Sequence, residues 1–323
     1  MVYMVFVYHG GFSRRRKAVD SRWRLSYSPP IVSYAHLHKG IIFLLISEFC
    51  FTVSTVFSKM LTNTSAISAI EVTFARFFLG LVVFSALVYK NSISLIPNKL
   101  SLLIWRGILN TVSVILFFMA SQYTTITNTH MLNMTYPFFI FLFSPLFFRS
   151  EKVSPFLYLI LIFALVGIWL VINPDFQSVN KGDMFGLASG IVAAFAVITL
   201  NMARKNDSTP VILFYLMSIG TVVNGLAMLP VFVMPAGSQW LLITASALAG
   251  VGGQICITYG YRYITARAGG LVSTSRVLYA VVLGMLIFGE SLTWRVGAGG
   301  TLILLSIVAV TWLQKPEPGP PQG

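Results

Sequence analysis

The chain has 323 residues, of which 56% are hydrophobic and only 10% are charged, and its mean hydropathy is +0.82. This composition excludes an ordinary soluble globular protein and is typical of a membrane protein that crosses the lipid bilayer many times. The formal net charge of +13 would favour nucleic-acid binding in a soluble chain, but here the basic residues lie in short segments between apolar runs, so we expect no nucleic-acid partner.

The chain begins with a basic tail, residues 1–39, which carries seven lysines and arginines. Ten apolar runs of spanning length follow, since roughly 20 helical residues cross the hydrocarbon core of a bilayer. The sequence therefore predicts an all-α polytopic membrane protein with ten transmembrane helices. We expect these helices at residues 41–61, 67–89, 101–122, 126–148, 155–172, 184–204, 210–233, 239–261, 268–289 and 295–313.

The basic residues between these runs predict how the chain is oriented. With the N-terminus in the cytoplasm, 17 of the 22 lysines and arginines, Arg106 among them, fall on the cytoplasmic side and three fall on the far side. The remaining two, Arg76 and Arg276, lie inside spans. Because the cytoplasmic loops of membrane proteins are enriched in Lys and Arg, we expect both termini in the cytoplasm and the bacterial inner membrane as the location.

The first span carries Glu48, Thr52, Thr55 and Lys59 at positions i, i+4, i+7 and i+11, which form one stripe on a helix. A polar stripe inside a bilayer has to face other helices or a cavity, because Glu48 would have no partner in lipid. Two interpretations of Glu48 follow. It is either a proton carrier or cation ligand in a cavity wall, or the partner of one of the two arginines inside spans.

Arg76, in the second span, also allows two interpretations: a cavity residue, or a side chain that extends to the membrane surface. In the fourth span, His130, Asn133 and Pro137 share one face, with Tyr136 beside them. Pro137 is expected to break this helix at mid-depth, as the broken helices of transporters do at their substrate sites. For His130, packing inside the bundle is the alternative to ligand binding.

The eighth span contributes Gln254, either as a cavity residue or as a hydrogen-bonding partner between helices. The ninth span contains Ser273 and, near its centre, Arg276. Arginine stays charged, so Arg276 must face protein, water or a ligand at that depth. Because a guanidinium binds carboxylate or phosphate through two hydrogen bonds, this residue predicts an anionic or zwitterionic substrate.

The two halves of the chain resemble each other. The first span aligns with the sixth at an offset of 142 residues, and the second with the seventh at an offset of 140. Duplication of a five-helix unit predicts two repeats of opposite orientation in the membrane, because five is odd. The predicted divisions are an N-terminal tail (1–39), a first repeat (40–172), a linker (173–181), a second repeat (182–313) and a cytoplasmic C-terminal tail (314–323).

Two stretches add a family resemblance, TYPFFIFLFSPLFFRSEKVS at residues 135–154 and FGESLT at residues 288–293. With these motifs, the ten spans and the doubled unit, residues 40–313 resemble the EamA-type transporters of the drug/metabolite transporter (DMT) superfamily. The resemblance implies a central cavity between the halves and a peripheral position for the fifth and tenth helices. Val277 stands where the family often has proline, so the motif does not imply a break in the ninth helix.

We therefore predict a secondary transporter that moves a small organic metabolite across the membrane by alternating access. The resemblance extends to exporters of amino acids and to carriers of nucleoside-like or S-adenosylmethionine-like compounds, and does not choose among these. The predicted substrate site comprises Arg276, Glu48, Asn133, Tyr136, Pro137, Ser273, Gln254, Arg76 and His130.

We expect neither enzymatic activity nor a metal or cofactor, because the sequence contains no HExxH, GxSxG or GxxxxGK[ST] motif. Two other classes remain as alternatives: a membrane scaffold or sensor, and a passive channel. The sequence leaves open the direction of transport, its coupling to protons and the oligomeric state.

Overall fold

The computed structural model describes residues 34–123, 126–148, 154–172, 181–288 and 293–313. Within these ranges the chain forms helices joined by short connections, with no β-strand. The first helix begins at Tyr34, inside the predicted N-terminal tail. The rest of that tail, the C-terminal tail and nearly all of the predicted linker lie outside the described residues.

The helices follow the predicted spans closely. In the first half they are α1 (Tyr34–Thr64), α2 (Ala69–Lys90), α3 (Leu100–Tyr123), α4 (Ile126–Asn133), α5 (Tyr136–Phe147) and α6 (Pro155–Ile172). In the second half they are α7 (Lys181–Arg204), α8 (Thr209–Met228), the short 3-10 helix η1 (Leu229–Val231), α9 (Gln239–Gly260), α10 (Ala266–Ser273), α11 (Ser275–Phe288) and α12 (Trp294–Leu313). The fourth predicted span is thus divided into α4 and α5, and the ninth into α10 and α11.

Seven segments within the described ranges are long and apolar enough to cross a membrane. They are Leu37–Thr64, Ala69–Lys90, Leu100–Ala120, Lys181–Arg204, Thr209–Val231, Gln239–Gly260 and Ala266–Ile287. Three shorter apolar helices are Tyr136–Phe147, Pro155–Val171 and Trp294–Val310. The prediction of an all-α polytopic membrane protein is confirmed, while the number of ten transmembrane helices stays a prediction.

Local chemistry sets several helix ends. At the start of α2, the amide of Glu71 donates to the hydroxyl of Ser68, and the amide of Ser68 donates back to the Glu71 carboxylate, at 3.3 and 3.4 Å. The amide of Ala268 donates to the hydroxyl of Thr265 at the start of α10. Pro210 occupies the first turn of α8, where its lack of an N–H is tolerated.

The surface of the bundle is apolar, whereas its interior holds many polar side chains. Phe163, Leu226 and Leu286 are examples of large hydrophobic side chains that are exposed. Glu48 and Ser189, in contrast, are fully buried. This distribution suits a lipid environment, in which polar groups find partners only inside the protein.

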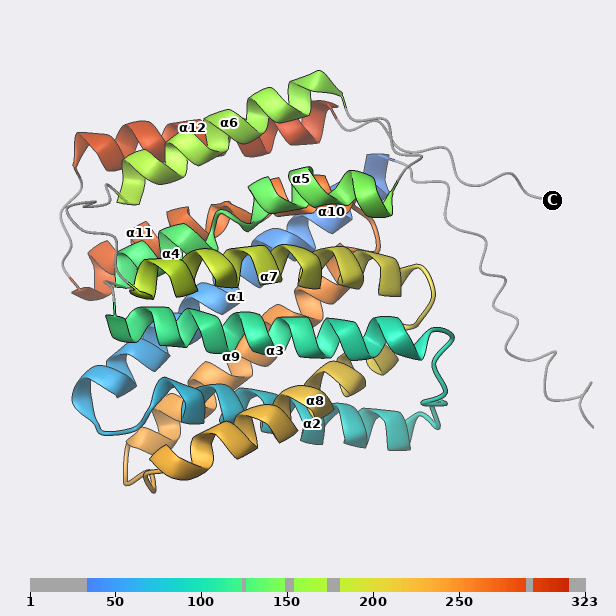
Figure 1. Cartoon of the computed structure of the whole chain (residues 1–323), viewed down its shortest axis with the longest axis vertical. Helices are drawn as coiled ribbons and strands as arrows, with labels where there is room; N and C mark the ends of the chain where they lie inside the picture. Colours follow the sequence, from blue (N-terminus) through green and yellow to red (C-terminus); the bar gives the residue numbers. More distant parts are fainter. Residues whose placement is uncertain (1–33, 124–125, 149–153, 173–180, 289–292, 314–323) are drawn as a thin grey trace, which may run out of the picture.

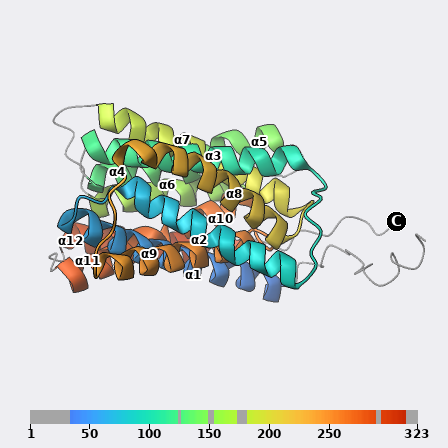
Figure 2. The ribbon, with the colours of Figure 1, turned by 90° about the horizontal axis from the view of Figure 1, so that it is seen from below.

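The helices run back and forth along one axis, so that α1 begins and α12 ends at the same end of the bundle (Figure 1). α1 packs along α9, α3 packs along α7, and α2 packs on α8. Seen from below, the pair of α1 and α9 and the pair of α3 and α7 form opposite sides of the bundle, with α2 and α8 between them (Figure 2). α6 and α12 pack on each other at one edge (Figure 1), the position that the resemblance implies for the fifth and tenth helices.

Glycines allow close helix approach at two places. A Cβ atom at Gly190 of α7 would lie 2.8 Å from the carbonyl oxygen of Leu132 and 3.0 Å from Oγ1 of Thr135, so α7 lies directly against the segment between α4 and α5. A Cβ atom at Gly167 of α6 would lie 2.8 Å from the carbonyl oxygen of Gly299 on α12. Small residues at such contacts are typical of helix packing in lipid.

Candidate functional site

The first of two broken helices lies between α4 and α5. The amide and the hydroxyl of Thr135 both donate to the carbonyl oxygen of Leu132, at 3.3 and 2.5 Å. The amide of Phe138 then donates to the carbonyl of Thr135 at 2.9 Å. These bonds span only three residues and tighten the chain, while Pro137 stands in the first turn of α5. The break expected at Pro137 is therefore present.

The second broken helix, between α10 and α11, repeats these bonds without a proline. The amide and the hydroxyl of Thr274 donate to the carbonyl of Leu271 at 3.2 and 2.7 Å, and the amide of Val277 donates to the carbonyl of Thr274 at 3.1 Å. Each of these residues lies 139 positions after its counterpart in the first break. The proline motif did not imply this break, but a threonine hydroxyl that bonds a nearby helical carbonyl accompanies both.

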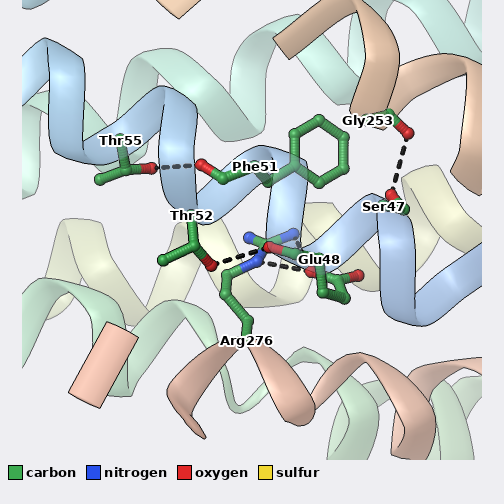
Figure 3. A network of polar contacts seen from close by, with 7 residues as sticks. All are labelled: Ser47, Glu48, Phe51, Thr52, Thr55, Gly253 and Arg276. Carbon is green, nitrogen blue, oxygen red and sulfur yellow. Dashed lines mark hydrogen bonds and ion pairs between the residues drawn. The ribbon is translucent and has the colours of Figure 1, made fainter. Parts of the chain in front are cut away.

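Arg276, near the start of α11, extends to α1 and pairs with Glu48 (Figure 3). Its Nε donates to Oε2 of Glu48 at 2.6 Å, and its Nη2 lies 2.5 Å from the same oxygen. The Glu48 side chain is fully buried, whereas 22% of the Arg276 side-chain surface stays accessible. The ion pair therefore joins the first helix to the second broken helix, and the guanidinium points into the bundle.

Neighbouring side chains hold Glu48 and Arg276 in place. Oγ1 of Thr52 donates to the backbone carbonyl of Glu48 at 2.7 Å, and Oγ of Ser47 donates to the carbonyl of Gly253 on α9 at 2.9 Å (Figure 3). Cζ of Arg276 lies 5.1 Å from the centroid of the Phe51 ring, a cation–π distance. The polar face predicted for the first span thus lies inside the bundle.

A cavity of about 170 Å³ lies beside this ion pair. Its wall is formed by helices from both halves of the chain, and Arg276 is part of it. The lining residues are Phe51, Thr55, Arg76, Arg106, Asn110, Ser113, Val114, Phe117, Phe118, His130, Asn133, Tyr136, Ala193, Ala196, Val197, Gln254, Ile257 and Arg276.

Contacts to α3 and α7 position two predicted residues of the first broken helix. Nδ2 of Asn133 donates to Oγ of Ser189 on α7 at 2.9 Å, and Ser113 of α3 donates to the carbonyl of Ser189 at 3.0 Å. The ring of His130 packs edge-on against Phe117 of α3, with centroids 4.9 Å apart. His130 therefore combines the two interpretations, because it packs on an aromatic ring and also lines the cavity.

Arg76 lines the cavity, which is the first of its two interpretations. Its Cζ lies 5.2 Å from the centroid of the Phe77 ring. A Cβ atom at Gly250 of α9 would collide with Cδ of Arg76 and lie 2.8 Å from its Cγ, so the glycine leaves room for this side chain. Gln254, one helical turn further along α9, also lines the cavity and is 4% exposed.

Arg106 is a cavity residue that the sequence interpretation missed. It was counted with the basic residues of the cytoplasmic side; in the structure it lies in the first turns of α3, is 3% exposed, and donates from Nη1 to the carbonyl of Ala196 at 3.0 Å. Arg106, Asn110 and Ser113 are spaced i, i+4 and i+7, so a polar stripe on α3 was the available signal. Counting Arg106 only as a charge on the cytoplasmic side left it out of this stripe.

Three of the predicted site residues lie behind the cavity wall. Glu48 contacts the cavity only through Arg276. Pro137 packs against α10, where a Cβ atom at Gly270 would lie 3.5 Å from it. Ser273 is fully buried in α10. Within the residues that the structure describes, no group of three or more His, Cys, Asp or Glu side chains is arranged to hold a metal ion.

Comparison with known proteins agrees with this fold. The model of the EamA-like transporter family matches residues 38–173 and again residues 180–312. One relative, the pseudopaline exporter CntI of Pseudomonas aeruginosa, is 24% identical over 281 residues, which cover 86% of this chain and 98% of the exporter. Another, human solute carrier family 35 member G1, is 26% identical over 296 residues, which cover 85% of this chain and 80% of the carrier.

A solved crystal structure is similar in fold, with a TM-score of 0.69 at 17% sequence identity, over 83% of this chain and 96% of the other. The family and the relatives are transporters rather than enzymes, which supports membrane transport of a small molecule. Because the family model covers most of the sequence in two successive matches, the chain belongs to the EamA-like transporter family of the DMT superfamily.

Proposed function

We propose that this protein is a secondary carrier that moves a small anionic or zwitterionic organic metabolite across the membrane by alternating access. The observation that carries this proposal is the cavity inside the bundle, whose wall contains Arg276 paired with the buried Glu48. An arginine held at the cavity wall offers charge-assisted hydrogen bonds to a carboxylate or phosphate. Arg276 is the proposed primary contact, and Asn133, Tyr136, His130, Gln254 and Arg76 are the proposed surrounding contacts.

We further propose that the ten helices form two inverted repeats. Helices α1 and α7 run in opposite directions along the bundle (Figure 1). In such repeats α1 corresponds to α7, α2 to α8 and α3 to α9. The contact of α1 with α9 then has its counterpart in the contact of α7 with α3, and the contact of α2 with α9 has its counterpart in that of α8 with α3. All four contacts are present. The contacts of α2 with α8 and of α6 with α12 turn into themselves. Inverted repeats of this kind are the usual frame for alternating access.

Hydrogen bonds between the halves lie at both ends of the bundle and support this mechanism. At the end where α1 begins, the amide of Asn98 donates to Oδ1 of Asp207 at 2.7 Å, and Nδ2 of Asn98 donates to the carbonyl of Asn206 at 2.6 Å. At the other end, the amide of Val233 donates to Oε1 of Glu71 at 3.2 Å. In the proposed cycle the connection at one end breaks while the other holds, so the cavity opens to one side at a time.

The ion pair of Arg276 and Glu48 supports a proposal for coupling between substrate binding and protons. An acidic group of the substrate would compete with Glu48 for Arg276. A Glu48 carboxylate released from its partner but still buried would be costly, and uptake of a proton removes that cost. We therefore propose that the carrier is coupled to protons through Glu48. We also propose that both termini lie in the cytoplasm, as the distribution of lysine and arginine favours, and that the location is the bacterial inner membrane.

Transport by purified protein in proteoliposomes tests this function. Vesicles would be loaded with a panel of labelled amino acids, organic acids and nucleosides, and flux would be compared with and without a pH gradient. We expect saturable flux of at least one compound, which responds to the gradient and falls at least tenfold in Arg276→Gln. Arg262→Gln, at an exposed arginine beyond α9, is the matched control and should transport normally.

The alternatives predict other results. A passive channel would give flux that does not saturate and is not driven by a proton gradient. A membrane scaffold or sensor would give no flux of any compound. Normal transport by well-expressed Arg276→Gln would contradict the proposed role of this residue.

A further inference from the structure

The cavity wall carries more positive than negative charge. Three arginines line it, Arg76 from α2, Arg106 from α3 and Arg276 from α11. Among the described residues, the ion pair seen with one of these arginines is that of Glu48 with Arg276. With His130 left aside, the three arginines and this glutamate give the described part of the wall a surplus of two positive charges.

Arg106 is the more deeply buried of the two wall arginines, Arg76 and Arg106, that have no ion pair with a carboxylate in the described part of the chain. Its residue is 3% exposed, and Nη1 bonds a backbone carbonyl, that of Ala196. Its Nε has no hydrogen-bond partner within the described part of the chain. Burial of a guanidinium without a counter-charge is costly, and an anionic ligand in the cavity would offset this cost.

Arg76 adds a second cation of this kind. Its Nε also lacks a hydrogen-bond partner among the described residues, and its contact there is the ring of Phe77. Asn110, one turn after Arg106, has an unpartnered Nδ2 donor in the same wall, whereas Oε1 of Gln254 is an unpartnered acceptor. Of these four unpartnered atoms, three are donors and one is an acceptor, which fits a ligand that carries oxygen acceptors.

The size and the apolar part of the wall limit the ligand further. A cavity of 170 Å³ is close to one of roughly 150 Å³ that is known to hold benzene, so the ligand is compact. Phe51, Phe117 and Phe118 line it, which provides apolar surface for a short carbon body between acidic groups.

We propose that the transported substrate is a compact organic dianion, in which one acidic group binds Arg276 and the second binds Arg106 and Arg76. A short dicarboxylate and a phosphomonoester share this chemistry. The inference rests on the proposed carrier function and names the charge class of its substrate.

Binding to the purified full chain in detergent, at constant ionic strength and pH 7.5, tests the proposal. One arm compares malonate, succinate and glutarate with their monoamides and diamides, and the other compares glycerol 1-phosphate and phenyl phosphate with glycerol and phenol. In at least one arm we expect a dianion to bind about tenfold more tightly than its partner of lower charge, as measured by thermal shift or calorimetry. The arm that responds tells carboxylate from phosphate.

Variants separate a direct contact from a general effect of charge. In Arg106→Gln the affinity for a dianion should fall to about the affinity for its partner of lower charge. Arg106→Lys should keep part of the preference for the dianion, and the exposed control Arg262→Gln should keep all of it. If Arg106→Gln does not yield folded protein by gel filtration, Arg76→Gln provides the same comparison. A preference that survives the removal of Arg106 or of Arg76 would overturn the assignment of these residues.

The outcomes for this inference and for the carrier function are distinct. If no dianion in either arm binds better than its less charged partner, the dianion proposal is overturned, and transport of a zwitterion in proteoliposomes would leave the carrier function standing. Tight binding of a dianion that never crosses the membrane would support the site but contradict the carrier function.

Discussion

The two broken helices, α4–α5 and α10–α11, have the same backbone bonds but different side chains. Both breaks contain a threonine whose amide and hydroxyl bond the carbonyl three residues earlier. The first adds Pro137, and the second has Arg276 at the position 139 residues later. The threonine turn therefore accompanies the break in both halves, while the position two residues later holds a proline in one half and the charged residue of the site in the other.

The packing around the two breaks also differs. The first lies against Gly190 of α7, at a distance that leaves no room for a side chain. The second is tied to α1 by the ion pair between Arg276 and Glu48. Close contact fixes the first break, and electrostatic attraction fixes the second. The following substitutions test this difference.

The largest expected effect is on the ion pair of the second break. Glu48→Gln or Arg276→Gln alone should destabilise the protein by about 3 kcal/mol, because each leaves the other charge without its partner inside the bundle. The double variant should be more stable than either single variant. Unfolding in mixed detergent micelles measures these differences, and additive losses in the double variant would mean that the two residues do not act as a pair.

A smaller effect is expected for the close contact at the first break. Gly190→Ala should cost about 1–3 kcal/mol, because its Cβ would lie 2.8 Å from the carbonyl oxygen of Leu132. Gly252→Ala is the matched control, since its Cβ would have only Sγ of Cys50 nearby, at 3.9 Å. The same unfolding assay applies, and equal stability of the two variants would argue against tight packing at the break.

The threonine turns should respond equally in the two halves. Thr135→Val and Thr274→Val each remove a hydroxyl hydrogen bond, and we expect a loss of about 1 kcal/mol in both. Hydrogen exchange at the following residues would report local opening. A large effect in one half with none in the other would mean that the turns are not equivalent.

The smallest effect is expected for the proline itself. Pro137→Ala should lower the free energy of unfolding by about 0.4–1 kcal/mol, because the unfolded chain gains conformational freedom. The break should stay in place. A structure of this variant checks the result. A continuous helix through residues 126–147 would show that the proline, rather than the threonine turn, makes the first break.

Much of this architecture follows from the sequence because lipid offers no partners for charged or polar groups. A charged residue in a span has to face inward, so the stripe with Glu48 and the position of Arg276 were predictable. Arg106 was missed because its place near the end of the third span favoured the cytoplasmic surface, and its burial depends on how α3 lies against α7. The role of Gly250 beside Arg76 was likewise hidden, since contacts between α2 and α9 depend on tertiary packing.

The central claim is that the cavity opens to one side of the membrane at a time. Its direct test is labelling of Asn110→Cys with a membrane-impermeant maleimide, in a Cys50→Ser, Cys256→Ser background, from either side of oriented vesicles. A thiol crosslinker would close one end through cysteines at positions 98 and 207, or the other through cysteines at positions 71 and 233. We expect labelling only from the side opposite the crosslink in each case. Labelling from both sides in a crosslinked protein, or from neither side without a crosslink, would contradict it.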